Sequence, residues 1–302
     1  MSKYVVATAY GDPDVLALRE EEIGEPDADE ALIEVRAAGV NPVDVKMYSG
    51  AFGNDPEALP RRLGLEAAGV DIATGEEVIA YPASGAYADR LLVSKSNVFP
   101  KPEGMEWAAA AGLMLTGVTA SHLIEATNVG EGDTVVVHGG SGGVGLMAVQ
   151  LAKLRGARAI ATASPRNHDL LRELGAEPVE YGEGLEERLR DMAPDGIDSA
   201  LDVAGTDEAV DVSLSLVDDR NRIATIVAFQ RAVDAGFKAL GGGPGADPGT
   251  EVRNAARSDL VDSVSDGVLR VVVAGTYPLS EVAVAHRRIL DGHTTGKLAL
   301  IP

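Results

Sequence analysis

The chain has 302 residues, carries 26 Lys plus Arg against 47 Asp plus Glu for a formal charge of -21, and contains no cysteine. The length predicts about two domains, because a domain averages about 150 residues. Without cysteine there is no disulfide framework, no Cys-bound zinc or iron–sulfur cluster and no thiol nucleophile. The acidity argues against nucleic-acid binding, which requires a net basic face.

The first ten residues lack the basic-then-apolar run of a signal peptide. No segment offers the roughly 18 consecutive apolar residues that a membrane helix needs. We therefore expect a cytoplasmic protein that does not enter a membrane.

From residue 3 to about residue 118, short β-type runs are broken by Gly and Pro. Examples are ALIEVRA (31–37), EVIAY (77–81) and YADRLLV (87–93). This part is predicted to be mostly β. The turn-rich stretch Gly50–Arg62 is predicted to be a loop.

From residue 119 the pattern changes to strands that alternate with helices. The predicted strands are 134–138, 157–163, 178–181, 199–203 and 222–228, and the predicted helices are 144–154, 167–174, 185–192 and 207–216. This alternation predicts a parallel sheet covered on both faces, which is a doubly wound α/β domain.

The stretch Gly241–Gly249 consists mostly of Gly and Pro, and it is predicted to be a linker or a loop bordering a cofactor or substrate cleft. A helix is predicted after it at 251–264. The last part of the chain is predicted to return to β structure at 269–273 and 298–301, with a helix near 280–290.

One glycine motif indicates a nucleotide site. Gly140, Ser141, Gly142, Gly143, Val144 and Gly145 fit G-x-G-x-x-G, directly after the apolar strand TVVVH and before an apolar helix. The first glycine is predicted to permit a tight turn, the second to let backbone N–H groups approach a pyrophosphate, and the third to allow close helix-to-strand packing. The pyrophosphate then lies at the positive helix N-terminus. We expect all six residues to bind a dinucleotide.

The end of the next predicted strand distinguishes the two nicotinamide dinucleotides. An NAD site has an acidic residue there to bind the ribose 2′-hydroxyl. The segment TASPR (162–166) has none, whereas its Ser164 hydroxyl and Arg166 guanidinium suit a 2′-phosphate. We therefore predict NADPH rather than NADH, with Ser164 and Arg166 as contacts.

Other catalytic chemistries lack their residues in this chain. The five histidines show no metal-ligand spacing such as His-x3-His, and no G-x-S-x-G nucleophile motif occurs. We predict no metal site. The remaining reaction is direct hydride transfer, in which a nicotinamide carries the chemistry and the protein orients it.

Several segments, in order along the chain, resemble the zinc-free quinone oxidoreductase branch of the medium-chain dehydrogenase/reductase superfamily. They are RAAGVNPVD (36–44), GLEAAG (64–69), GAYAD (85–89), LTGVTA (115–120), VVHGGSGGVGLMAVQ (136–150), DVAG (202–205) and HRRILDGHTTGKL (286–298). The resemblance implies a GroES-like β domain from residues 1–117 and 256–302, with a Rossmann NADP-binding domain at 118–255 between them. It also implies a homodimer.

The resemblance also suggests site residues. It places Asn41 near the nicotinamide and the substrate, where its amide could hydrogen-bond a carbonyl; the alternative is a turn residue before Pro42. Lys46 and Tyr48 are candidate proton donors or ordinary surface residues, and Tyr48 is retained with Asn41 as a catalytic candidate. The further cofactor contacts that it implies are Thr116, Thr119, Tyr181, Val203, Ala204, Val227, Ala228, Phe229 and Lys297. Helix capping is the alternative for the two threonines, and a core position at a strand end is the alternative for Tyr181.

The function expected from these features is an NADPH-dependent, zinc-independent oxidoreductase that transfers hydride to a quinone or a similar electron-poor conjugated carbonyl. Such a small-molecule acceptor is already electrophilic and needs no metal. An enoyl or 2-alkenal double-bond reductase is one alternative. A non-catalytic NADPH-binding redox sensor is the other, because a fold alone does not decide function.

Overall fold

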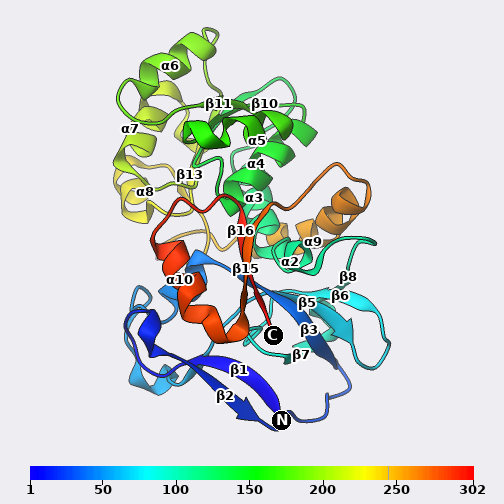
Figure 1. Ribbon diagram of the computed structural model, residues 1–302. Helices are drawn as coiled ribbons and strands as arrows, with labels where there is room; N and C mark the ends of the chain where they lie inside the picture. The colour runs from blue at the N-terminus through cyan, green and yellow to red at the C-terminus, as the bar shows by residue number, and fades with distance from the viewer. Residues whose placement is uncertain (244) are drawn as a thin grey trace. The chain divides into compact units, whose positions relative to one another are not determined.

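The computed structural model describes residues 1–243 and 245–302. The chain divides into two compact units: the first unit is Met1–Leu115 with Ser258–Pro302, and the second unit is Thr116–Arg257. The chain leaves the first unit in helix α3 (Met114–Ala126) and returns to it in helix α9 (Thr250–Ser265) (Figure 1). Pro244, which belongs to the predicted loop Gly241–Gly249, lies outside the described residues.

The first unit is built mainly from β-strands, as the sequence pattern predicts. Its strands are β1 (Ser2–Ala7), β2 (Leu16–Glu21), β3 (Glu30–Val40), β4 (Arg61–Arg62), β5 (Ala67–Asp71), β6 (Glu77–Ala80), β7 (Arg90–Ser94), β8 (Val98–Pro100), β15 (Val273–Pro278) and β16 (Lys297–Ile301). They form a small sheet ordered β2-β1-β4 and a larger one ordered β15-β16-β3-β5-β6-β8, in which β7 also pairs with β3. Its short helices are α1 (Pro42–Lys46), α2 (Trp107–Ala110) and α10 (Val282–Leu290).

The second unit contains one six-stranded parallel sheet. Its strands are β9 (Thr134–His138), β10 (Arg158–Thr162), β11 (Glu177–Val179), β12 (Ser199–Asp202), β13 (Ile223–Thr225) and β14 (Lys238–Ala239). The spatial order is β11-β10-β9-β12-β13-β14, which is the 3-2-1-4-5-6 order of the Rossmann fold. The order reverses between β9 and β12, so the glycine motif that follows β9 lies at the switch point where such sheets bind ligands.

Helices cover this sheet because its central strands are apolar on both faces. They are α4 (Gly143–Leu154), α5 (His168–Glu173), α6 (Leu185–Met192), α7 (Asp207–Leu216) and α8 (Phe229–Ala235) (Figure 1). Helix α4 packs on β9 and β10, α5 on β11, α7 on β12 and α8 on β13 and β14. Val136, Ile160 and Ala200, from three neighbouring strands, belong to one buried core.

Several predicted boundaries are corrected by the structure. The run 269–273 was expected to be a strand, but strand β15 spans Val273–Pro278. The residues of β15 alternate between partly buried and exposed, and they include Gly and Pro. Its sequence pattern is therefore weaker than that of the neighbouring apolar run. The region predicted to be mostly β also contains α1, α2 and the first turn of α3, and helix α8 was not predicted.

Candidate functional site

The turn between β9 and α4 has the geometry that the glycine motif predicts, with one correction. The positive φ of the turn, 79°, belongs to Gly139, one residue before the motif. Two hydrogen bonds hold the turn to the end of β10: the Gly139 N–H donates to Thr162 Oγ1 (3.0 Å) and the Gly140 N–H donates to the Thr162 carbonyl oxygen (2.9 Å). The tight turn therefore depends on Gly139, and Gly140 has a different function.

The three glycines of the G-x-G-x-x-G pattern differ in how much room a side chain would have. A Cβ on Gly140 would lie 2.6 Å from the Cβ of Ala161, so this glycine lets β9 and β10 approach each other. A Cβ on Gly145 would lie 2.3 Å from the carbonyl oxygen of Gly139, which confirms its predicted packing function. A Cβ on Gly142 would meet only the Gly139 oxygen, at 3.5 Å. Two glycines are thus needed by the fold, and the third leaves the helix N-terminus open to a ligand.

A dinucleotide fits this arrangement. Helix α4 has 12 residues, and its first N–H groups have no acceptor within the helix. Their partial positive charge favours a phosphate group. Gly142 precedes the helix with extended backbone and no side chain, so the amides of Gly143 and Val144 can be approached closely. The motif residues can therefore hold the pyrophosphate of a nicotinamide cofactor.

Beside the turn, the ends of β12 and β13 are held by a buried polar network. Asp202 accepts hydrogen bonds from the N–H groups of Ala204 (3.0 Å) and Gly205 (2.8 Å) and from the Thr225 hydroxyl (2.7 Å). Burial nevertheless raises the pKa of this carboxyl. The Thr225 hydroxyl oxygen in turn accepts from the N–H groups of Val227 (3.1 Å) and Ala228 (3.0 Å).

This network fixes the backbone of two predicted cofactor-binding segments, Val203–Ala204 and Val227–Ala228. Phe229 follows directly as the first residue of α8, and its ring lies against Gly243, where a Cβ would be 2.6 Å away. Asp202 and Thr225 were not predicted as site residues. The sequence feature that could have predicted them is a polar residue at the carboxyl end of each of two neighbouring parallel strands.

The residues predicted to select the cofactor lie at the ends of β10 and β11. Ser164 precedes a short 3-10 helix, Pro165–Asn167, that contains the exposed Arg166. Tyr181 is exposed just after β11, which pairs in parallel with β10. The three side chains therefore belong to the same edge of the sheet.

Helix α3 carries the predicted contacts Thr116 and Thr119, both buried. Arg253 of α9 donates from Nη1 to Thr119 Oγ1 (3.2 Å) and from Nε to His122 Nδ1 (3.3 Å). The other ring nitrogen of His122 lies 3.5 Å from Asp247 Oδ2. The second half of the Gly241–Gly249 stretch is thus attached to α3 through Asp247, which the sequence did not predict.

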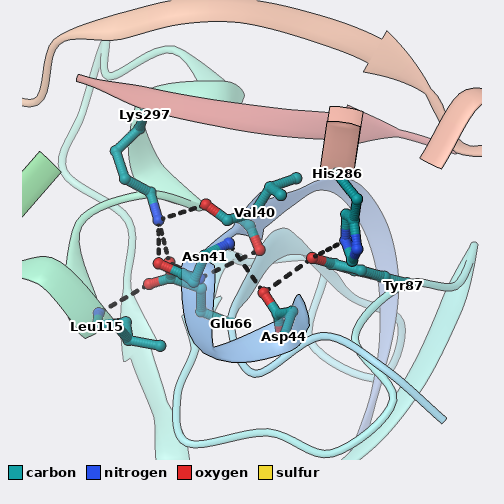
Figure 2. A network of polar contacts seen from close by, with 9 residues as sticks. Val40, Asn41, Asp44, Glu66, Tyr87, Leu115, His286 and Lys297 are labelled. Atoms are coloured by element: carbon teal, nitrogen blue, oxygen red, sulfur yellow. Dashed lines mark hydrogen bonds and ion pairs between the residues drawn. The ribbon is translucent and has the colours of Figure 1, made fainter. Parts of the chain in front are cut away.

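In the first unit, a buried network surrounds Asn41 (Figure 2). The Asn41 amide nitrogen donates to Glu66 Oε1 (2.9 Å) and to the Gly39 carbonyl oxygen (3.4 Å). Lys297 Nζ donates to Asn41 Oδ1, to Glu66 Oε1 (2.9 Å) and to the Val40 carbonyl oxygen (3.1 Å). The second Glu66 oxygen accepts from the Leu115 N–H (2.8 Å).

These hydrogen bonds fix the side-chain amide of Asn41. Its amide is almost fully buried, and both ends of the amide are hydrogen-bonded within the first unit. Asn41 and Lys297, which the sequence placed on the cofactor side independently, are direct neighbours. Glu66 was part of a recognised segment, but it was not predicted as a site residue. A charged residue inside the apolar run LEAA was the available signal, because a buried charge requires a partner.

Tyr48, the other catalytic candidate, lies in the core of the first unit with no exposed surface. Its hydroxyl is 2.8 Å from His286 Nδ1, and burial raises the pKa of this hydroxyl above its usual range. Because this hydroxyl is hydrogen-bonded to His286, the function proposed below gives Tyr48 no direct contact with the substrate. Lys46, the other candidate donor, is the last residue of α1.

No helix in ranges 1–243 and 245–302 is long and apolar enough to cross a membrane. Over the same ranges, no three His, Cys, Asp or Glu side chains are grouped so that they could hold a metal ion.

Comparison with known proteins identifies the family. Residues 27–103 match the model described as alcohol dehydrogenase GroES-like domain, and residues 143–241 match the model described as zinc-binding dehydrogenase. The chain is 31% identical to the quinone oxidoreductase of Pseudomonas aeruginosa, with 100% of both chains covered. It is also 31% identical to the chloroplastic NADPH-dependent alkenal/one oxidoreductase of Arabidopsis thaliana, over 98% of this chain and 78% of that protein.

A solved structure agrees with these matches. A mycobacterial protein in complex with NADPH superposes with a TM-score of 0.86 at 27% identity, with 100% of both chains covered. The expected GroES-like and Rossmann-type α/β fold is confirmed. The chain belongs to the quinone oxidoreductase branch of the medium-chain dehydrogenase/reductase superfamily, and it is an oxidoreductase that uses a nicotinamide cofactor and acts on a small-molecule substrate.

Proposed function

We propose that the protein is an NADPH-dependent, zinc-independent reductase of quinones. The single observation that carries the cofactor choice is the end of β10, where Ser164 and the exposed Arg166 stand in place of the acidic residue of an NAD site. Arg pairs with phosphate in a planar, charge-assisted geometry. The mycobacterial neighbour was solved with NADPH, and the relative from Pseudomonas aeruginosa is named a quinone oxidoreductase.

In this proposal the cofactor-binding residues are those of the second unit. The N–H groups at the start of α4 bind the pyrophosphate, and Ser164, Arg166 and Tyr181 bind the adenosine 2′-phosphate. The segments fixed by Asp202 and Thr225 orient the nicotinamide side. The bound nicotinamide supplies the hydride. A local positive helix end and Arg166 must outweigh the repulsion between a protein of charge -21 and an anionic dinucleotide.

The residues proposed to act on the acceptor are Asn41 and Lys297 of the first unit. Asn41 is the residue proposed to contact the acceptor, whose oxygen would take the place of the Gly39 carbonyl at the long 3.4 Å bond of the amide nitrogen, and Lys297 brings a buried positive charge to the other end of the amide. A positive charge and fixed amide dipoles stabilise an acceptor oxygen that becomes negative, and they require no metal. Acceptors that are already electrophilic suit such a site best. Simple ketones and alcohols are expected to react poorly.

The relative from Arabidopsis thaliana favours a second candidate, an alkenal or enone double-bond reductase. That reaction needs a hydride at the β carbon and a proton at the α carbon. Initial rates of NADPH and NADH oxidation with 1,4-benzoquinone, trans-2-alkenals and enoyl thioesters separate the two. The proposal predicts the highest kcat/KM with NADPH and the quinone. A higher value with an alkenal supports the second candidate, and absence of turnover with every acceptor contradicts both.

We also propose that the protein is a homodimer, as the resemblance implies. Strand β14 lies at one edge of the six-stranded sheet, where the Ala239 carbonyl oxygen already accepts from the Asp247 N–H (2.8 Å), so the proposal rests on the resemblance. Light scattering coupled to gel filtration tests this state, and a monomeric mass contradicts it.

A further inference from the structure

Four buried side chains in the first unit form a chain of hydrogen bonds beside Asn41. Tyr48 OH lies 2.8 Å from His286 Nδ1, His286 Nε2 lies 3.2 Å from Tyr87 OH, and Tyr87 OH lies 2.8 Å from Asp44 Oδ2. The relative exposure of all four residues is 0%. Asp44 lies within α1, Tyr48 just after it, Tyr87 in the segment before β7 and His286 in helix α10, and Figure 2 shows the part from His286 to Asp44.

The hydrogens of this chain can be assigned from the donors available. The Tyr87 hydroxyl donates to Asp44, so its oxygen must accept from His286 Nε2–H. A neutral imidazole has one N–H, which leaves Nδ1 to accept from the Tyr48 hydroxyl. Every bond then points the same way, from Tyr48 toward Asp44. The His286 ring packs against both tyrosine rings, with a centroid distance of 5.6 Å to Tyr48 and 5.7 Å to Tyr87.

Asp44 connects this relay to the candidate site. The Asn41 backbone N–H donates to Asp44 Oδ2 at 2.9 Å, as the capping pair of helix α1. The same oxygen therefore receives both the Tyr87 hydroxyl and the Asn41 backbone. Asp44 Oδ1 has no hydrogen-bond partner among the described residues. A proton can bind there without breaking either bond at Oδ2.

Asp44 also differs in charge balance from the neighbouring carboxylate. Glu66 is paired with Lys297 at 2.9 Å, whereas no cation within the described ranges forms an ion pair with Asp44. Its surroundings are the Tyr87 hydroxyl and the Asn41 N–H, with the charges of Lys297 and Glu66 farther away. Burial raises the pKa of Asp44 to about 7, and it lowers the pKa of His286 to about 4. Tyr48, at the far end, also faces the charges of Asp12 and Arg287.

We propose that Tyr87 and His286 are positioning residues for the reaction, because with Tyr48 they form a one-way relay that sets the protonation state of Asp44 and, through it, the backbone of Asn41. This inference rests on the proposed function, in which Asn41 contacts the acceptor. An ionised Asp44 gives the Asn41 N–H a charge-assisted hydrogen bond, which is shorter and stronger than the neutral one. The ionised form is therefore the active form, and kcat/KM increases with pH through the Asp44 transition.

The first test is spectroscopic and needs no cofactor or substrate. Infrared spectra of the full-length protein between about pH 6 and about pH 9 report the carbonyl stretch of a buried carboxylic acid, which disappears near pH 7 as Asp44 ionises. Asp44→Asn removes this band. Tyr87→Phe shifts its loss to higher pH, because the Tyr87 hydrogen bond stabilises the carboxylate. Tyr10→Phe, which removes an exposed hydroxyl bonded to the Asp55 carbonyl, is the matched control and leaves the band unchanged.

Nitrogen NMR of the histidines tests the direction of the relay. His286 is expected as a neutral Nε2–H tautomer, and Tyr87→Phe is expected to give a mixture of tautomers, because it removes the acceptor of Nε2–H while the Tyr48 oxygen can still accept from Nδ1–H. A wild-type Nδ1–H tautomer overturns the assignment. So does a carboxylic-acid band that is insensitive to Tyr87→Phe. These results do not depend on turnover, so they remain informative if the proposed function fails.

The second test concerns positioning. With NADPH and 1,4-benzoquinone, Tyr87→Phe is expected to lower kcat/KM about fivefold at pH 7, since raising the pKa of Asp44 from about 7 by about one unit lowers its ionised fraction by about that factor at this pH. Raising the pH restores its rate. Asp44→Asn is expected to show, at every pH, the low kcat/KM that the wild type shows at acid pH. Loss of structure alone does not explain such a pH-independent value. A spectroscopic shift in Tyr87→Phe without a shift in the pH profile overturns the positioning role.

Discussion

The two units build their polar sites in different ways. In the first unit, side chains distant in sequence surround Asn41: Glu66 is 25 residues away and Lys297 is 256 residues away. In the second unit, a continuous segment of backbone makes the site, from the end of β9 through the glycine turn into α4. The first site is therefore fixed by tertiary packing, and the second by local geometry.

Two buried histidines, one in each unit, differ in their hydrogen-bond partners. His286 in the first unit is hydrogen-bonded on both ring nitrogens, to Tyr48 and Tyr87. His138, the last residue of β9, is buried, and neither of its ring nitrogens has a hydrogen-bond partner among the described residues. Burial lowers the pKa of both side chains to about 4. Of these two histidines, His286 has an acidic residue, Asp44, connected to it by hydrogen bonds, whereas the third buried histidine, His122 of the second unit, lies beside Asp247.

The largest effect is expected from breaking the tertiary site. Lys297→Met leaves the Glu66 carboxylate buried and without its cation, which costs about 3–5 kcal/mol of the free energy of unfolding. Denaturant unfolding measures this loss. The double variant Lys297→Met/Glu66→Gln removes both charges and is expected to recover much of it. If the double variant loses as much stability as the sum of the single ones, the pair is not coupled as described.

The next largest effect concerns the local site. Gly145→Ala places a Cβ 2.3 Å from the Gly139 oxygen and is expected to destabilise the protein by up to about 3 kcal/mol. Gly142→Ala is the matched variant, because its Cβ meets only an oxygen 3.5 Å away. It is expected to keep the melting temperature while weakening NADPH binding, measured by titration calorimetry. Equal destabilisation by the two variants would contradict the division of functions within the motif.

The contrast between the units explains what the sequence could predict. Strand, glycine turn and helix follow one another within residues 134–154, so their periodicity and spacing predicted the Rossmann-type sheet and its nucleotide turn. The short helices α1 and α2 were not predicted because they have only 5 and 4 residues and no complete periodic pattern.

The network around Asn41 could not be predicted in the same way. The motif residues Asn41 and Lys297 were recognised one at a time, but their contact depends on β16 pairing beside β3, a pairing between opposite ends of the chain. No local pattern encodes that pairing. Asp44, Tyr87 and His286 each lie in a recognised segment, yet only tertiary packing brings them into one chain of hydrogen bonds.

Acid sensitivity tests the comparison of the two histidines. A histidine whose folded pKa is lowered from 6.5 to about 4 stabilises the fold above pH 6.5, and this contribution is lost as the pH falls toward 4. For His138 the loss between about pH 7 and about pH 5 is roughly 2 kcal/mol. His138→Leu is expected to remove this dependence in denaturant unfolding measured at each pH. An unchanged slope in the variant would show that another group titrates.

In the first unit, His286 and Asp44 make the stability of the fold depend on pH in opposite directions, and the two effects offset each other over the same pH range. His286 destabilises the fold as the pH falls from 6.5 to about 4, whereas the raised pKa of Asp44 means that its protonation stabilises the fold as the pH falls below about 7. Asp44→Asn removes the second term only and is expected to make the protein more acid-sensitive, by an amount similar to the His138 contribution. An unchanged acid response in this variant argues against the offset.

The smallest effect is expected at the edge of the second unit's sheet, where Arg166 is exposed and its interactions are screened by solvent. Arg166→Glu replaces a cation suited to a 2′-phosphate with an acid suited to a 2′-hydroxyl. The ratio of kcat/KM for NADPH to that for NADH is expected to fall about tenfold, which corresponds to about 1.4 kcal/mol. Arg172→Glu, on the neighbouring helix α5, is the matched control, because it makes the same charge change where no cofactor contact is proposed. If both variants change the ratio equally, Arg166 acts through the general charge of the surface and does not contact the phosphate.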